Sequence, residues 1–174
     1  MRPLRLAGLV VLLAIVVFSA LVYGELPARI PQHFDAGGTP TREVATSAVS
    51  WFALPAISVA VWALLAWLGS LIPTHPELFN FPQKARFLAL PAAQRAPVIV
   101  AMQWFLEATA LVVIVVLGLV QLLVWRVATT GEAGVLATLP AAGILVVFGL
   151  TAVALVRLAR AVGDAERRAR DARG

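Results

Sequence analysis

The residues with the clearest potential for chemistry are His33 and Asp35, two positions apart in the sequence. An imidazole and a carboxylate at this spacing can converge in an extended segment, where they could bind a metal ion or sense protons. Further ligands are scarce, because Glu25 and Glu43 are the only carboxylates nearby and the chain has no cysteine. We therefore favour a structural interpretation, in which His33 hydrogen-bonds to loop backbone and Asp35 caps the turn that follows. We expect no metal site and no other cofactor.

The sequence also lacks the usual signatures of catalysis. It contains no glycine-rich phosphate loop, no Gly-x-Ser-x-Gly, no His-Glu-x-x-His and no paired acids on one helix. We therefore expect that the protein is not an enzyme.

Composition places the chain in a membrane. Of its 174 residues, 61% are hydrophobic and 13% are charged, and the mean hydropathy is +0.91. A water-soluble domain of this size would expose large apolar patches, which excludes an ordinary cytosolic enzyme or a disordered tail. The net charge of +5 comes from basic residues that flank apolar stretches. This distribution is typical of contact with a lipid bilayer and not with nucleic acid.

Four apolar segments are long enough to cross a bilayer, which requires about 20 apolar residues in a helix. They cover residues 6–23, 48–72, 98–125 and 135–156. Pro55 lies within the second segment and is expected to kink its helix. The sequence thus predicts an all-α fold: a bundle of four transmembrane helices that forms one integral membrane domain over residues 1–174. A cleavable signal peptide over the first segment is the alternative that we favour less.

The basic residues predict how the chain crosses the membrane. Three of them follow the first and third segments, namely Arg29, Arg42 and Arg126. Eleven lie on the other side, namely Arg2, Arg5, Lys84, Arg86, Arg95, Arg157, Arg160, Arg167, Arg168, Arg170 and Arg173. Cytoplasmic loops carry the excess of such residues, so we expect both termini in the cytoplasm and the protein in the inner (plasma) membrane. The basic tail, residues 157–174, would rest as a helix on anionic headgroups.

A few polar and small residues lie within the apolar segments. Glu107 falls near the inner edge of the hydrocarbon, where an acid is a functional hypothesis by default. We favour an interfacial residue that either snorkels to the membrane surface or pairs with an arginine, for which the candidates are Arg86, Arg95 and Arg160. Hydrogen bonds between helices are expected from Ser58, Thr109, Gln121 and Thr151. Close helix approach is expected at Gly118, Gly143 and Gly149.

The loop between the first two segments, residues 25–47, is the most informative part of the chain. Pro27 and Pro31 oppose helix formation and favour extended geometry in the residues before them. Gly37 and Gly38 indicate a turn. We expect a short structured loop on the outer face of the membrane. Its side chains that should point down toward the spans are Leu26, Ile30 and Phe34.

The segment Leu26–Pro40, LPARIPQHFDAGGTP, resembles the signature of a membrane domain of unknown function, number 1648. In that family, Leu-Pro, Ile-Pro, His-Phe, a following Gly and a Pro occur at this spacing just after a first transmembrane helix. The resemblance covers about residues 6–60. The later stretch Asn80–Leu90 is similar to an Asn-x-Pro-x-Lys-x-x-x-Leu pattern of many relatives, with Phe87 where Trp is usual.

The resemblance also implies a function. The domain occurs in SdpI-type immunity proteins of bacteria, which protect a producer cell from its own secreted peptide toxin. It implies a bacterial protein that binds a peptide toxin or another membrane protein at its outer face. The residues expected to form the binding platform are Pro27, Pro31, His33, Phe34, Asp35 and Gly38. The alternative function is a small transporter or permeability protein, which would need polar groups converging in the middle of the membrane.

Overall fold

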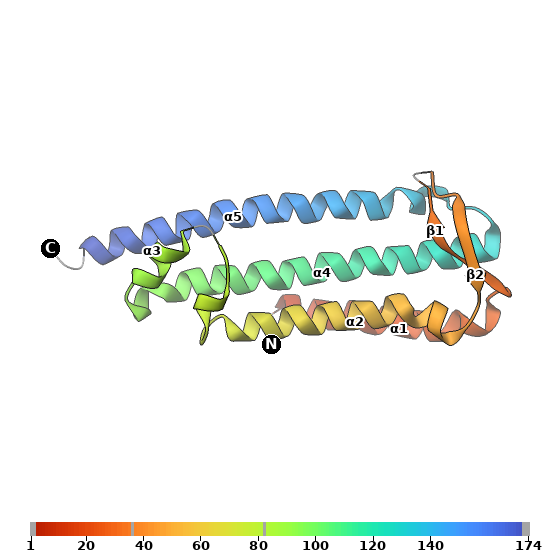
Figure 1. The fold of residues 1–174 in the computed structure, drawn as a ribbon, viewed down its shortest axis with the longest axis horizontal. Coiled ribbons are helices and arrows are strands. Elements are labelled where there is room, and N and C mark those ends of the chain that lie inside the picture. The colour runs from red at the N-terminus through yellow and green to blue at the C-terminus, as the bar shows by residue number, and fades with distance from the viewer. Residues whose placement is uncertain (1–2, 36, 82, 172–174) are drawn as a thin grey trace.

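The computed structural model describes residues 3–35, 37–81 and 83–171. Four long helices lie side by side, and a β-hairpin crosses one end of them (Figure 1). The long helices are α1 (Pro3–Val22), α2 (Ala48–Leu71), α4 (Ala92–Thr130) and α5 (Leu139–Asp171). The hairpin consists of β1 (Arg29–Phe34) and β2 (Pro40–Ala45). The shorter helices are α3 (Lys84–Ala89) and the 3-10 turns η1 (Tyr23–Glu25), η2 (Pro76–Leu78) and η3 (Gly134–Ala137).

All four long helices are long and apolar enough to cross a membrane, so the predicted all-α architecture of four spans is confirmed. Two of the helices extend well beyond the predicted spans. Helix α4 begins at Ala92, six residues before the predicted boundary, and α5 continues to Asp171. The apolar pattern marks only the part of a helix that lies in lipid, whereas the backbone hydrogen bonds continue into water.

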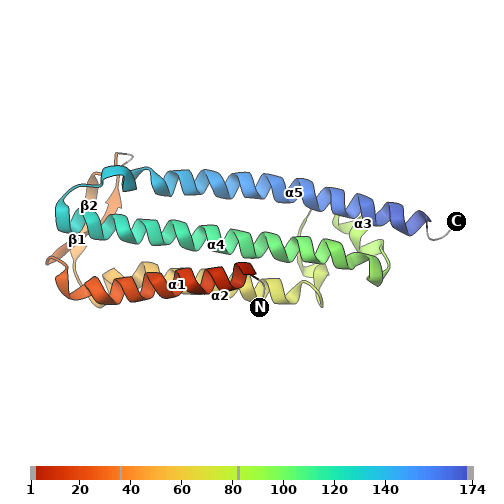
Figure 2. The ribbon, with the colours of Figure 1, turned by 180° about the vertical axis from the view of Figure 1, so that it is seen from behind.

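Helix α4 is the centre of the arrangement. It lies between the α1–α2 pair on one side and α5 on the other, as the two opposite views show (Figures 1 and 2). Glycines permit close approach on both sides. A Cβ atom on Gly118 of α4 would lie 2.9 Å from the Ile15 side chain of α1, and one on Gly143 of α5 would lie 2.3 Å from Val116 of α4. The prediction for Gly149 is wrong, because it faces open space.

Buried apolar side chains form a cluster at each end of the helices. The hairpin-end core contains Ile30, Trp51 and Val124. The opposite-end core contains Ile72, Phe87, Leu90, Val98, Met102, Leu158, Val162, Ala165 and Ala169. Between the two clusters, large apolar side chains of α5 such as Leu145 and Phe148 are exposed at 71% and 68%, as expected for residues that face lipid.

Two tryptophans of α4 indicate where the membrane lies along the molecule. Trp104 and Trp125 are 21 positions apart, which corresponds to about 32 Å along a helix. This length matches the roughly 30 Å of a hydrocarbon core, and tryptophan prefers the two membrane interfaces. The first turns of α4, the last turns of α5 and all of α3 therefore project beyond the hydrocarbon at the end opposite the hairpin.

The fold keeps the two sets of basic residues apart. Arg2 and Arg173 lie outside the described residues. Of the remaining cations, three lie at the hairpin end and nine lie at the opposite end or on the helix turns next to it.

Candidate functional site

The turn of the hairpin is built around Asp35. The backbone N–H groups of Gly37 and Thr39 each donate to Asp35 Oδ1 at 2.9 Å, and Gly38 N donates to the Asp35 carbonyl at 3.0 Å. The predicted cap is therefore observed. The N–H of Thr39, together with that of Gly37, lowers the pKa of this carboxyl below its ordinary value, because a hydrogen-bonded carboxylate is favoured over the acid.

Gly38 fixes where the tip of the hairpin rests. Its φ is +83°, and a Cβ atom would lie 2.6 Å from Ala137 Cβ and 2.8 Å from Ala133 Cβ. Glycine is thus required twice, once for the left-handed backbone and once for the contact. The tip is docked on the connection between α4 and α5, so the hairpin reaches from the α1–α2 pair across to α5 (Figure 1).

The inner face of the hairpin is anchored in the hairpin-end core. Ile30 and Trp51 are each 1% exposed and pack against Val124 of α4. The Trp51 Nε1–H donates to the Ser19 carbonyl at 2.8 Å, which ties α2 to α1 beneath the hairpin. The apolar residues packed around this core include Leu26, Phe34 and Val44. The expectation that Leu26, Ile30 and Phe34 point toward the spans is confirmed.

Pro55 affects the same core through its missing N–H. In a regular helix the residue at position 55 would donate to the carbonyl of Trp51, which a proline cannot do. Gln121 of α4, 1% exposed, supplies the donor: its Nε2 lies 3.3 Å from the Trp51 carbonyl oxygen. An amide from another helix thus completes the hydrogen bonds of α2.

The other predicted links between helices are not formed. Ser58 donates to the Leu54 carbonyl at 2.8 Å, within its own helix, and Thr151 does the same with Val147 at 2.9 Å. The buried hydroxyl of Thr109 has no hydrogen-bond partner in the described part of the chain. Short hydroxyl side chains reach their own preceding turn more easily than a neighbouring helix, which explains why Gln121 alone of the four crosses over.

The outer face of the hairpin is polar and carries charges of both signs. Arg29 pairs with Glu43 across the strands, with Nε 3.5 Å from Oε2, and also donates to the Glu43 carbonyl at 3.1 Å. His33 lies opposite Arg42. Both side chains are exposed, and neither side chain makes a hydrogen bond or an ion pair within residues 3–35, 37–81 and 83–171. The predicted bond from His33 to loop backbone is therefore not observed.

The six predicted platform residues have different environments. Pro27, His33 and Asp35 are exposed, Phe34 is half-buried, and Pro31 and Gly38 are buried. In the described residues no group of three or more histidine and acidic side chains converges as metal ligands would. His75 lies at the other end of the molecule, 3.2 Å from Glu77.

Glu107 is paired, but with a partner that was not predicted. Arg5 Nε donates to Glu107 Oε1 at 2.8 Å, and the Glu107 side chain is 4% exposed. Arg86, Arg95 and Arg160 are not the partners. The start of α1 lies beside this turn of α4, which brings Arg5 within reach, whereas Arg95 donates to the Leu88 and Leu90 carbonyls.

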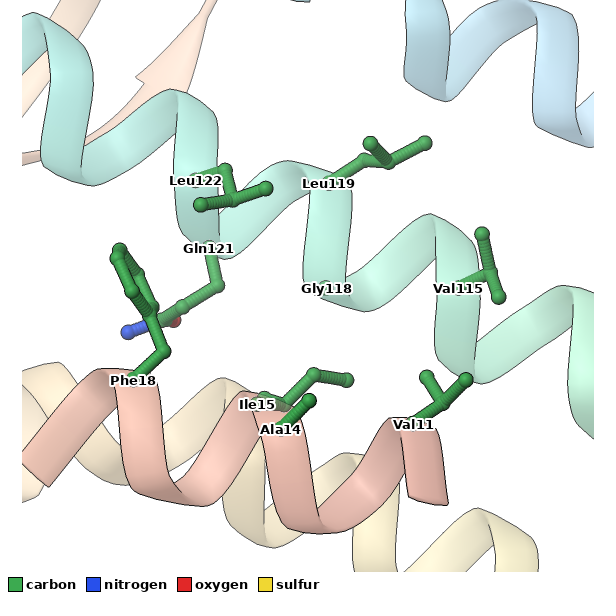
Figure 3. A pocket seen from close by; sticks show the side chains of 9 residues that line it. All are labelled: Val11, Ala14, Ile15, Phe18, Val115, Gly118, Leu119, Gln121 and Leu122. Atoms are coloured by element: carbon green, nitrogen blue, oxygen red, sulfur yellow. The ribbon is translucent and has the colours of Figure 1, made fainter. Parts of the chain in front are cut away.

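A groove of about 320 Å³ opens between α1 and α4 (Figure 3). Its walls are Val11, Ala14, Ile15, Phe18, Val115, Gly118, Leu119, Gln121 and Leu122. Gln121 provides the polar atoms among these side chains, and its Nε2 is directed to the Trp51 carbonyl. Such a lining suits hydrocarbon and provides no series of polar groups of the kind that solute sites in transporters use.

Comparison with known families finds a match that includes the hairpin. Residues 10–59 match the model of the family described as "Domain of unknown function (DUF1648)". The match contains most of α1, the whole hairpin and the first half of α2. Comparisons with curated proteins and with solved structures give no significant match. The chain is thus a multi-pass membrane protein that carries a DUF1648 domain over residues 10–59.

Proposed function

We propose that the protein is a non-catalytic binding protein of the plasma (inner) membrane. Its hairpin would dock a peptide, or an external segment of another membrane protein, on the outer face. The observation that carries the proposal is the contrast between the two faces of the hairpin. The inner face is held by Ile30 and by the docked Gly38, whereas His33 and Arg42 on the outer face are exposed and unpaired within the described residues.

The distribution of charge supports an external position for the hairpin. Nine of the described arginines and lysines lie toward the opposite end, and three lie at the hairpin end. The positive-inside rule then assigns the opposite end, with both termini, to the cytoplasm.

The chemistry of the outer face favours a partner with carboxylates. Arg42 contributes a cation without a partner among the described residues and His33 an exposed imidazole, while Arg29 and Glu43 already pair with each other. A two-stranded sheet also has open edges, to which an extended peptide can add main-chain hydrogen bonds. The resemblance of the loop to SdpI-type immunity proteins supports a secreted peptide toxin as the partner and a protective role.

The orientation can be tested directly because the native chain has no cysteine. We expect a His33→Cys variant to react with a membrane-impermeant maleimide on intact cells. The matched control is Thr74→Cys, an exposed position at the opposite end, which should react only after the membrane is opened. The reverse labelling pattern would contradict the proposed orientation.

Binding can be tested with a photo-reactive amino acid at position 33 or 42 in the native host cell. We expect both positions to cross-link to one peptide or protein, and the same probe at position 74 not to do so. The variant pair His33→Ala and Arg42→Gln should reduce the cross-linked product while membrane insertion stays intact. Phe34 is a poorer test, because its half-buried ring packs in the hairpin-end core. A complete lack of adducts at both positions would contradict the proposal.

A further inference from the structure

A second groove lies between α4 and α5, near the end opposite the hairpin, with a volume of about 240 Å³. It is lined by Pro97, Val100, Ala101, Trp104, Ala154 and Arg157. The lining combines one cation with apolar walls, unlike the apolar groove between α1 and α4. This combination indicates an amphipathic occupant.

Arg157 is held in this groove by an aromatic ring. Its guanidinium carbon lies 5.3 Å from the centre of the Trp104 ring, within the range of a cation–π interaction. No carboxylate pairs with Arg157 among the described residues, whereas Arg167, further along α5, pairs with Asp164. The positive charge of Arg157 is therefore oriented but not neutralised by the protein.

The depth of the groove matches the headgroup region. Arg157 is the first charged residue after the apolar part of α5, and Trp104 marks the interface on α4. Val100 and Ala101 extend the groove away from the hydrocarbon, while Val153 on α5, 46% exposed, leads back into it. A molecule lying here would place polar groups beside Arg157 and hydrocarbon along α5.

We propose that this groove binds an anionic phospholipid of the leaflet at the opposite end. Arg157 contacts the lipid phosphate, and Trp104 positions the guanidinium. Ala154 contacts the glycerol and first methylene groups, and Val100 and Ala101 lie beside the headgroup. Charge complementarity selects an anionic lipid, since basic sites between helices near the cytoplasmic face attract anionic headgroups. The proposal is independent of the partner of the hairpin.

The test uses the purified full chain in neutral detergent, with native mass spectrometry to count bound phosphatidylglycerol and phosphatidylcholine. We expect the wild type to retain phosphatidylglycerol preferentially. The loss of one unpaired cation near a membrane surface weakens anionic-lipid binding about fivefold through the loss of long-range attraction. Because Arg157 also contacts the phosphate, Arg157→Gln should reduce the preference by about tenfold. Trp104→Leu keeps the charge and should have a smaller effect.

The matched control is Arg167→Gln, which removes a charge from the same helix outside the groove. Because Asp164 already pairs with Arg167, this cation attracts lipid less than an unpaired one, and the change should reduce the preference less than about twofold. Equal losses in both variants would show general attraction to the basic tail and would overturn the site. So would an unchanged preference in Arg157→Gln. A water-soluble glycerophosphate should not displace the lipid, and displacement at equal concentration would identify a free-phosphate site and overturn the proposal.

Discussion

The two ends of the molecule are stabilised in different ways. At the hairpin end, a small core is supplemented by side chains that hydrogen-bond to backbone carbonyls, Trp51 to Ser19 and Gln121 to Trp51. At the opposite end, nine buried apolar residues form the larger core, and they come from α3, α4, α5 and the segments just after α2 and α3. The opposite end also has a side-chain bond between helices, from Gln103 Nε2 to the Gly69 carbonyl at 2.8 Å. The difference lies in the apolar contribution: a hairpin on a membrane surface has little apolar area to bury, so directional bonds make up a larger share of its contacts, whereas the opposite end adds a larger packed core.

The core of the DUF1648 segment is closed by side chains of a helix outside that segment. Residues 10–59 contain Ile30, Trp51 and Pro55, but the residues that close their core, Gln121 and Val124, belong to α4. Helix α4 also contributes Val98 and Met102 to the opposite-end core. We infer that the two ends are separate packing units that share α4.

The largest effects are expected from removing the buried aromatic side chain of each core in a separate variant. Trp51 and Phe87 are 1% and 0% exposed, and removing a buried aromatic side chain costs about 3–5 kcal/mol of unfolding free energy. In amide hydrogen exchange, Trp51→Ala should increase exchange in the hairpin and leave α3 protected. Phe87→Ala should do the opposite. If either variant loosened both ends equally, the two ends would form one cooperative unit and the distinction would be lost.

Gly38→Ala should separate the hairpin tip from the connection between α4 and α5 without disturbing either core. The added Cβ would collide with Ala133 and Ala137 at a backbone φ of +83°. We expect a loss of about 2 kcal/mol from strain and overpacking together. Gly131→Ala is the matched control, since Gly131 has a φ of +76° but faces open space. A loss in Gly131→Ala as large as in Gly38→Ala would show that backbone strain alone matters and that docking contributes nothing.

Gln121→Leu tests the bond that replaces the missing N–H of Pro55. It leaves the Trp51 carbonyl without its donor in a buried site, and we expect a loss of about 1 kcal/mol. In a Pro55→Ala background the helix can supply its own N–H to that carbonyl. The same Gln121→Leu change should then have a smaller effect, measured as a double-mutant cycle. Full additivity of the two substitutions would disprove the compensation.

The spans and the turn could be predicted from local sequence. Apolar length alone marks four helices, because lipid requires long apolar segments with internally bonded backbones. The Asp35 cap also depends on residues within four positions of it. The sequence predicts only a structured loop where the structure has two strands, because the bulges between Pro31, His33 and Phe34 interrupt the alternation that marks a strand.

Contacts between distant segments could not be derived in this way. The pairing of Arg5 with Glu107 joins positions 102 apart, and Arg157 meets Trp104 from another helix. Both depend on how far each helix is shifted along its neighbour, which an apolar pattern does not specify. Gly149 fails for the same reason, because its position on α5 does not reveal which face meets α4.

The smallest expected effect is the response of the hairpin turn to acid, which should differ from the response of the opposite end. The folded-state pKa of Asp35 lies below its ordinary value of 3.8, so the carboxylate stabilises the turn above that pH and the contribution is lost as the pH falls through the lowered pKa. Relative to the intrinsic exchange rate at each pH, the Gly37 and Thr39 amides should stay protected from pH 7 down to about 4 and should lose protection at lower pH. Glu77, at the opposite end, also has a lowered pKa, mainly from its own backbone N–H and then from His75.

The Asp35→Asn variant separates the acid response of Asp35 from that of Glu77, because it should remove the acid response of the hairpin amides alone. An unchanged acid response in that variant would assign the effect to the opposite end and would show that acid acts on the hairpin through α4.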